Sequence, residues 1–165
     1  METAKNAMQP EIRAAIREDF ADIARLMQQV HDLHSHGRPD IYKEMKDIFL
    51  EEEYSKMLTD PDYIMIGAEE DGRLTGFLIA KRKITPVNPM LHRNRTFFVD
   101  ALFVEQDCRR KGTAKRLYEY LAAKAEEEEC ARIDLKVWGF NKGALAFYQS
   151  MGFQIQSYNM EKKLI

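Results

Sequence analysis

Cysteine is scarce in this sequence of 165 residues, which contains two, Cys108 and Cys130. Two thiols without metal-type spacing argue against a disulfide framework and a cysteine-ligated metal site, and a cysteine without an identified histidine partner is seldom a nucleophile. The sequence also lacks an apolar run of about 20 residues, the length that crosses a bilayer. Near the N-terminus it lacks the apolar core of a secretory signal. We therefore expect a cytoplasmic protein with reduced thiols and no membrane partner.

An excess of charge of either sign is missing too. Lys and Arg number 25 against 27 for Asp and Glu, which gives a formal net charge of −2. This balance argues against a chain-wide basic surface, so no nucleic-acid partner is expected. With 45% apolar residues and this length, the chain has the composition and size of one domain. We expect that domain to cover residues 1–165, with its core at about 11–164.

Hydrophobic periodicity predicts alternating strands and helices. Two β-rich runs flank Asp71-Gly72, a residue pair favoured in tight hairpin turns, and apolar residues at helical spacing between Ile23 and Leu33 predict a helix. This order of elements predicts an α/β fold with a mixed sheet. The remaining expected elements are strands at 11–17, 96–104 and 131–140, helices at 42–58, from 109 onward and at 141–151, and a closing strand–turn–strand at 153–165.

The stretch Arg109–Leu121, RRKGTAKRLYEYL, opens a helix directly after the apolar run 97–104. Cations in a first helical turn oppose the positive end of the helix dipole. They become favourable when an anion binds, because the unpaired N–H groups of that turn converge on a phosphate, and Gly112 and Ala114 keep its approach open. The stretch therefore predicts a diphosphate site, with a merely solvated basic surface as the alternative. It is neither a Walker loop nor a dinucleotide fingerprint.

A second motif supports the first. The stretch Asn141–Phe153, NKGALAFYQSMGF, has Asn, Ala, Tyr and Gly-Phe at spacings 0, 3, 7 and 11–12. Two other stretches accompany it, LFVEQDCRRKGTAKRLYEYL and the opening EIRAAIREDFADIARLM. With these three stretches the chain resembles the GNAT superfamily of acyl-coenzyme-A-dependent N-acyltransferases. The resemblance extends from about residue 11 to 164. Two departures, Gln106 where proline is common and Ala114 in place of a more frequent glycine, are tolerated variants in that family.

The resemblance implies an α/β (α+β) fold: a GNAT-like single domain whose mixed, mostly antiparallel sheet has splayed parallel central strands, here 97–104 and 133–138, flanked by helices. Acetyl-coenzyme A would lie between these strands as the acyl donor, with its pyrophosphate on the amides of 110–114 and its pantetheine arm along 102–104. Asn141 would contact that arm, although asparagine is also a good helix N-cap. The cofactor-binding residues implied are Leu102, Phe103, Val104, Arg109, Arg110, Lys111, Gly112, Thr113, Ala114, Asn141 and Tyr148.

For catalysis, the resemblance assigns Tyr148 as the acid that protonates the leaving thiolate and Asp100 as the candidate base. A backbone amide near Leu102 would stabilise the oxyanion, an effect worth about 3 kcal/mol in other acyl-transfer enzymes. From the residues alone, Tyr148 is alternatively a core aromatic, and Asp100 a surface acid or a holder of a cationic substrate. Two-residue alternation places Asp100 on one face with Phe98, Leu102 and Val104.

The acceptor side falls, by the same resemblance, on the first two helices and the loop before residue 96. Its candidate residues are His34, Tyr42, Asp100 and Trp138, of which Trp138 would stack against a cation. His31 and His34 lie about one helical turn apart, which is compatible with metal spacing. A third ligand is missing and the family needs no metal, so no metal site is predicted.

The sequence therefore predicts an acyltransferase that moves an acetyl group from acetyl-coenzyme A to a primary amine by direct attack in a ternary complex. A small-molecule amine is the first expectation for the acceptor. The alternatives are a protein N-terminus or lysine side chain as acceptor, a non-catalytic acyl-coenzyme A sensor of the same fold, and a phosphate-binding interaction module. Dimers are frequent in the family, so a homodimer is expected as well.

Overall fold

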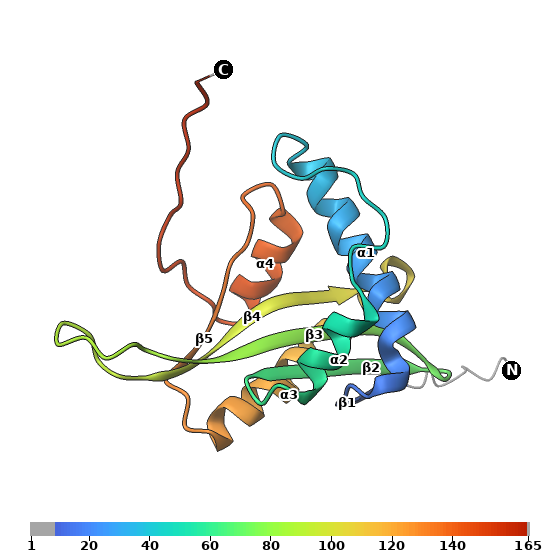
Figure 1. Ribbon diagram of the computed structural model, residues 1–165, viewed down its shortest axis with the longest axis horizontal. Helices are drawn as coiled ribbons and strands as arrows, with labels where there is room; N and C mark the ends of the chain where they lie inside the picture. Colours follow the sequence, from blue (N-terminus) through green and yellow to red (C-terminus); the bar gives the residue numbers. More distant parts are fainter. Residues whose placement is uncertain (1–8, 165) are drawn as a thin grey trace, which may run out of the picture.

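The computed structural model describes residues 9–164 and has one five-stranded sheet at its centre (Figure 1). Its strands follow chain order; the first four pair antiparallel, and the fifth pairs parallel with the fourth. The predicted mixed, mostly antiparallel sheet is confirmed. Residues 1–8 and 165 of the expected domain lie outside the described residues. The strands are β1 (Glu11–Ala14), β2 (Tyr63–Glu70), β3 (Arg73–Ile84), β4 (Arg95–Val104) and β5 (Arg132–Leu135).

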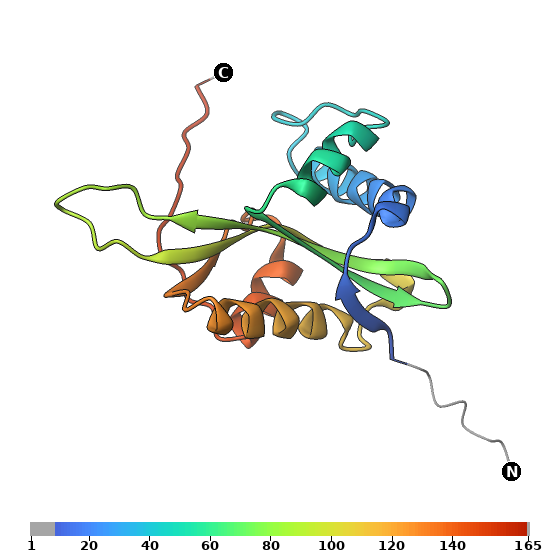
Figure 2. The ribbon, with the colours of Figure 1, turned by 60° about the horizontal axis from the view of Figure 1, so that its bottom comes forward.

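Helices cover both faces of the sheet, with α1 and α2 on one face and α3 and α4 on the other (Figure 2). One apolar cluster fills the α3 side and another the side of α1 and α2, so the sheet is buried on both faces. Within the described residues, no helix has the length and apolar content to span a bilayer. The helices are α1 (Phe20–Gly37), α2 (Glu51–Thr59), α3 (Thr113–Glu127) and α4 (Lys142–Ser150), with short 3-10 helices η1 (Arg17–Asp19) and η2 (Gln106–Cys108).

The hairpin predicted at Asp71-Gly72 is confirmed. These two residues have φ of 53° and 79°, the positive values that a type I′ turn requires and that an aspartate–glycine pair tolerates. β3 leaves the turn with seven consecutive buried residues from Leu74 to Ala80. A strand covered on both faces is expected to have such a run. The buried β3 therefore holds β4 in place beside it.

β4 and β5 run side by side for four residue pairs and then part. The pairs run from Thr96 with Arg132 to Val99 with Leu135. In the ladder between β4 and β3, a register shift at this point leaves Asp100 without an opposing residue. Asp100 is thus the extra residue of a β-bulge, a feature common next to active sites. The predicted splayed parallel strands are confirmed, and β5 is shorter than predicted.

The second predicted helix begins later than expected, because residues 42–50 form a loop and α2 covers only the rest. Asp47 has a φ of 53°, which lies outside the helical range. The loop bonds to α1 instead: the amide of Gln28 donates to the carbonyl oxygen of Met45 at 2.8 Å. The prediction at 42–50 is wrong because this contact between distant residues outweighs the local helical pattern.

The strand–turn–strand predicted at 153–165 is also wrong, since residues 153–164 belong to no strand. Gly152, with a φ of 90°, follows the end of α4, and the chain then runs away from the sheet in an extended course (Figure 1). Far from the sheet, Glu161 pairs with Arg38 at 2.9 Å, next to the end of α1. Ion pairs to another part of the chain replace the expected ladder, and an alternating sequence pattern does not reveal such a partner.

Candidate active site

The loop between β4 and α3 ends in a helix start without a side-chain cap. Arg110 and Gly112 both have positive φ, 65° and 81°, and Gly112 occupies the N-cap position. The first intrahelical bond runs from the N–H of Arg116 to the carbonyl of Gly112 at 3.0 Å. The amides of Thr113 and Ala114 precede that bond, so they have no acceptor in the helix and point toward an anion site.

A cavity of about 370 Å³ adjoins this helix start and extends to α4. Most of the residues that the sequence assigned to a phosphate cradle therefore meet around one space. Lys115 and Phe147 were not among the residues expected from the sequence. The one sequence feature that could have indicated Phe147 is its place directly before Tyr148 in the second motif. The cavity is lined by Val104, Arg109, Arg110, Gly112, Thr113, Ala114, Lys115 and Phe147.

The side chain of Arg109 faces back toward the end of β4. Its Nε donates to the carbonyl oxygen of Val104 at 2.8 Å, and its guanidinium carbon lies 5.1 Å from the ring centroid of Phe103. Arg109 therefore holds the loop against the strand, while Arg110 and Lys111 remain exposed. Of these two, Arg110 lines the cavity, whereas Lys111 lies 4.0 Å from Glu70.

The edge of β4 beyond Val99 is open, because β5 has left it. The N–H of Glu105 donates to the carbonyl of Thr75 in β3 at 2.8 Å. Successive residues of a strand direct their N–H and C=O groups to opposite sides, so Val104 and Leu102 direct theirs into the opening. The amide of Leu102, predicted as an oxyanion donor, thus faces the space between the parted strands.

α4 carries the second motif beside this opening. The side chain of Asn141 caps the helix by accepting from the N–H of Ala144 at 3.1 Å. Tyr148 is 9% exposed, with its ring centroid 5.2 Å from Phe147 and 5.4 Å from Phe153. Burial raises the pKa of Tyr148 to about 12, so its hydroxyl keeps its proton at neutral pH. Tyr148 is therefore a packed aromatic whose hydroxyl is protonated at neutral pH.

The bulge separates Asp100 from Leu102 and Val104, with which it was predicted to share a face, and leaves it on the face of Phe98 as predicted. Leu102 packs with the α3-side cluster, whereas Ala101 and Phe103 pack with the α1–α2 cluster. One extra residue at 100 reverses the alternation, so Asp100 does not share a face with Leu102. Asp100 is exposed, but the surrounding protein partly desolvates its carboxyl and so raises its pKa, and Lys81 and Lys83 oppose that rise. Such a carboxylate accepts protons more readily than an ordinary aspartate.

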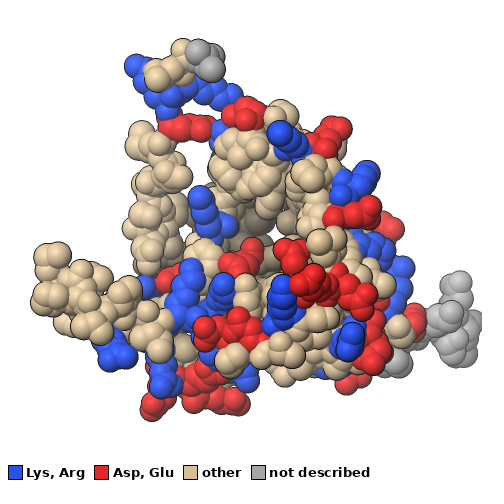
Figure 3. Space-filling model, in the orientation of Figure 1, with Lys and Arg blue, Asp and Glu red and all other residues tan. Residues whose placement is uncertain are grey.

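Three predicted acceptor residues come together in an aromatic cluster between α1 and the loop after β5. The rings of His34 and Tyr42 stack at 5.3 Å, and the indole N–H of Trp138 donates to the hydroxyl of Tyr42 at 3.2 Å. Phe140 approaches α1 so closely that a Cβ on Gly37 would lie 2.3 Å from its ring. Asp100, the fourth predicted acceptor residue, lies on β4. The face of the molecule drawn in Figure 3 is hollowed near its centre, with basic and acidic side chains around the hollow.

Burial lowers the pKa of His34, and the nearby His31 lowers it further. His34 is therefore a neutral member of the aromatic cluster at neutral pH. Within residues 9–164, no group of three His, Cys, Asp or Glu side chains is arranged to hold a metal ion.

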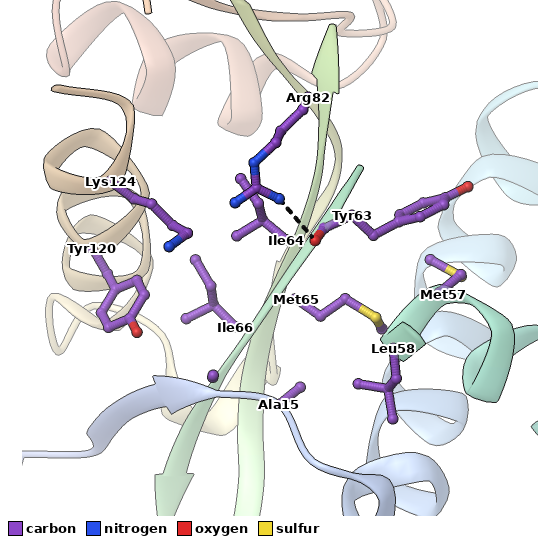
Figure 4. A pocket seen from close by; sticks show the side chains of 11 residues that line it. Ala15, Met57, Leu58, Tyr63, Ile64, Met65, Ile66, Arg82, Tyr120 and Lys124 are labelled. Atoms are coloured by element: carbon purple, nitrogen blue, oxygen red, sulfur yellow. Dashed lines mark hydrogen bonds between the residues drawn. The ribbon is translucent and has the colours of Figure 1, made fainter. Parts of the chain in front are cut away.

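A second cavity, of about 210 Å³, lies at the other edge of the sheet between α2 and α3 (Figure 4). Its floor is the outer edge of β2, and the guanidinium of Arg82 reaches over it to the carbonyl of Tyr63 at 3.3 Å. Arg82 also pairs with Glu128 at 2.6 Å, which holds its side chain in place. None of the residues assigned to catalysis lines this cavity.

Known proteins resemble this chain in both sequence and fold. The sequence profile of the acetyltransferase (GNAT) family matches residues 25–153. Among solved structures, a variant of the BH1408 protein from Bacillus halodurans is 24% identical with a TM-score of 0.91, over 94% of this chain and 99% of that one. The aminoglycoside N-acetyltransferase AAC(6')-Iy in complex with CoA is 18% identical with a TM-score of 0.70, over 93% and 98% of the two chains.

A ribosomal-protein-alanine N-acetyltransferase from Brucella melitensis is 24% identical with a TM-score of 0.66, over 93% of this chain and 99% of that one. A search of curated protein sequences finds no match. The solved structures establish the fold, and the family profile spans both motifs of this chain. The chain belongs to the GNAT acetyltransferase family, and it is an acyltransferase.

Proposed function

We propose that this protein transfers an acetyl group from acetyl-coenzyme A to a primary amine by direct attack in a ternary complex, and that the acceptor is a small molecule. The observation that carries the proposal is the continuity of the open edge of β4 with the uncapped start of α3. An extended pantetheine arm fits the open edge of β4, and a pyrophosphate fits the uncapped start of α3. The cavity of about 370 Å³ lies at their junction.

In this arrangement the pyrophosphate rests on the amides from Arg110 to Ala114. The pantetheine arm pairs with the backbone of Leu102 and Val104, which face the opening, while Asn141 aligns α4 through its cap. The thioester carbonyl then receives the N–H of Leu102. A fixed donor at that point stabilises the negative charge that develops on the oxygen.

The reaction needs a proton to leave the amine and another to reach the thiolate. Asp100 accepts the proton from the attacking ammonium, directly or through a water molecule, and the neutral amine then attacks the thioester carbon. When the tetrahedral intermediate collapses, the carbon–sulfur bond breaks and Tyr148 donates its proton to the sulfur. The second proton of the amine nitrogen then passes to the Tyr148 phenolate, directly or through a water molecule, which leaves a neutral amide and restores Tyr148. The raised pKa of Tyr148 keeps that proton available until the thiolate forms.

A thiol-release assay with acetyl-coenzyme A tests this proposal against a panel of amino acids, polyamines, aminoglycosides and short peptides. Turnover on small amines supports it, and turnover on peptides alone makes the chain a protein acetyltransferase. Titration calorimetry of acetyl-coenzyme A runs beside the assay. Binding without turnover on any acceptor points to a sensor, and no preference for acetyl-coenzyme A over free pyrophosphate points to a phosphate-binding module.

We also propose a homodimer. Two extended segments project from the body of the molecule, the end of the chain and the loop between β3 and β4 (Figure 1). Their large apolar side chains are strongly exposed: Tyr158 is 80%, Met160 89%, Val87 88% and Met90 85% accessible. A second copy would cover this apolar surface. Light scattering at micromolar concentration measures the mass, and a monomer at every concentration contradicts the proposal.

We further propose that residues 1–165 form a single N-acetyltransferase domain that works in the cytoplasm, where acetyl-coenzyme A is available as the donor. The single central sheet of the described residues supports the first point. Limited proteolysis tests it, because one domain gives one resistant core. Cell fractionation tests the location.

A further inference from the structure

Two lysines of β3 lie on the same face of the sheet as Asp100. Lys81 is opposite Phe98 in the ladder with β4, and Lys83 is opposite Thr96. Directly opposed residues of an antiparallel pair share a face. The Nζ of Lys83 lies 3.8 Å from the ring centroid of Phe98. Both ammonium groups are near enough to Asp100 to lower the pKa of its carboxyl.

Lys136 adds a third ammonium group at the point where the strands part. It follows Leu135, the last partner of β4, just as Asp100 follows Val99. Leu135 packs with the α3-side cluster, so alternation places Lys136 on the opposite face, with Asp100. Its Nζ lies 5.4 Å from the ring centroid of Trp138, next to the aromatic cluster.

These three cations form no ion pair among the described residues. Within residues 9–164, neither Lys81, Lys83 nor Lys136 has a carboxylate oxygen within 4.0 Å. Asp134, which pairs with Phe98 across the sheet, bonds to Arg132 at 2.9 Å, and the carboxylate of Asp60 acts on Lys81 from beyond ion-pair distance. The face therefore presents three ammonium groups without an ion-pair partner among the described residues, and two of them, Lys81 and Lys83, lie close to the Asp100 carboxylate.

The aromatic cluster is also unavailable to a cationic acceptor. The guanidinium carbon of Arg38 lies 5.1 Å from the ring centroid of Trp138, and Lys136 lies near the same ring. Cations of the protein itself already occupy the indole surface that would attract a positively charged ligand. A polyamine that approaches Asp100 would be repelled by the lysines of this face and by the cations over the Trp138 ring, because all of these groups are positively charged.

We infer that the acceptor carries an anionic group, a carboxylate or a phosphate, in addition to the amine that is acetylated. The inference rests on the proposed function and names the substrate class of its acceptor side. The amine faces Asp100, and the anionic group lies among Lys81, Lys83 and Lys136. Charge-assisted hydrogen bonds to ammonium groups are among the stronger polar contacts, and opposite charge at the entrance favours encounter with this class of molecule.

A competing explanation gives Lys81 and Lys83 a single task, that of keeping Asp100 ionised. Lys136 separates the two explanations, because it is not among the groups that shift the pKa of Asp100. If the lysines only tune Asp100, removal of the Lys136 ammonium changes no acceptor preference. If they bind an anion, its removal weakens anionic acceptors selectively.

The test compares amines in pairs that differ in the anionic group: β-alanine with 3-aminopropanamide, and O-phosphoethanolamine with ethanolamine. Spermidine serves as the cationic acceptor. For the unmodified protein we expect kcat/KM to be about 10-fold or more higher for at least one anionic member than for its neutral partner and for spermidine. The carboxylate and phosphate pairs show which of the two groups the site prefers.

In Lys136→Met we expect that preference to fall by about 10-fold through KM, with the neutral partner unchanged. Lys56→Met is the matched control, because Lys56 lies on α2 in an exposed pair with Glu52. Equal or better turnover of the neutral or cationic acceptors overturns the inference while leaving the acetyltransferase intact, and so does an equal loss for both members of a pair in Lys136→Met. No turnover on any acceptor overturns the proposed function, and the inference falls with it.

Discussion

Replacing Tyr148 by phenylalanine removes one hydroxyl and leaves the ring. The ring supplies the packing, at 5.2 Å from Phe147 and 5.4 Å from Phe153, so we expect the free energy of unfolding to change by less than about 1 kcal/mol. The hydroxyl supplies the proton for the leaving thiolate. Loss of a general acid costs about 10²–10⁴-fold in rate, which corresponds to about 3–5 kcal/mol in activation free energy.

The assay measures kcat by thiol release and stability by urea unfolding on the same Tyr148→Phe preparation. Tyr118→Phe is the matched control, because Tyr118 packs against Phe153 at the same 5.4 Å but from α3. We expect the control to keep its rate. A Tyr148→Phe rate within twofold of the unmodified protein would falsify the assignment and leave Tyr148 as a core aromatic. A parallel loss of stability and rate would also refute the reasoning, since packing would then explain both.

Three further predictions follow from single groups. Gly112→Ala forces a side chain into a φ of 81°, which costs about 1–2 kcal/mol, so calorimetry should show weaker acetyl-coenzyme A binding; unchanged affinity contradicts this. Lys83→Met removes a charge that lowers the pKa of Asp100, so the acidic limb of the pH–rate profile should move to higher pH, and a fixed limb refutes Asp100 as base. The pKa of His34 lies below its ordinary 6.5 in the fold, so the unfolded chain binds the proton first and stability should fall as pH drops below about 6.5. His34→Gln should flatten that part of the stability curve measured by urea unfolding. An unchanged slope would show that His34 is not the group responsible.

Local chemistry made much of the fold predictable. The turn at Asp71-Gly72 and the cap at Asn141 depend on residues adjacent in sequence, and a single sequence shows such residues directly. The helix start at Gly112 follows from the same kind of signal, because a glycine can adopt the positive φ that the loop needs. These elements determine where the candidate cofactor cavity lies.

The errors arose where distant residues decide. The face of Asp100 depends on how β4 registers with β3, and a strand pattern read alone cannot show a bulge. The loop at 42–50 is held by Gln28, and the end of the chain by Arg38. In both places a polar contact across the fold outweighs a favourable local pattern. The lysines of the same face escaped notice for the same reason, since Lys81 and Lys83 lie on β3 and Lys136 follows β5.

The bulge at Asp100 is not needed for the packing of β4. Phe97 and Val99 before the bulge, and Leu102 and Val104 after it, pack into one apolar cluster. Without the extra residue at 100 these four side chains would still alternate onto the same face at a regular two-residue spacing. The extra residue therefore interrupts the ladder with β3 without adding to the core. What it provides is an aspartate at the point where β4 and β5 part.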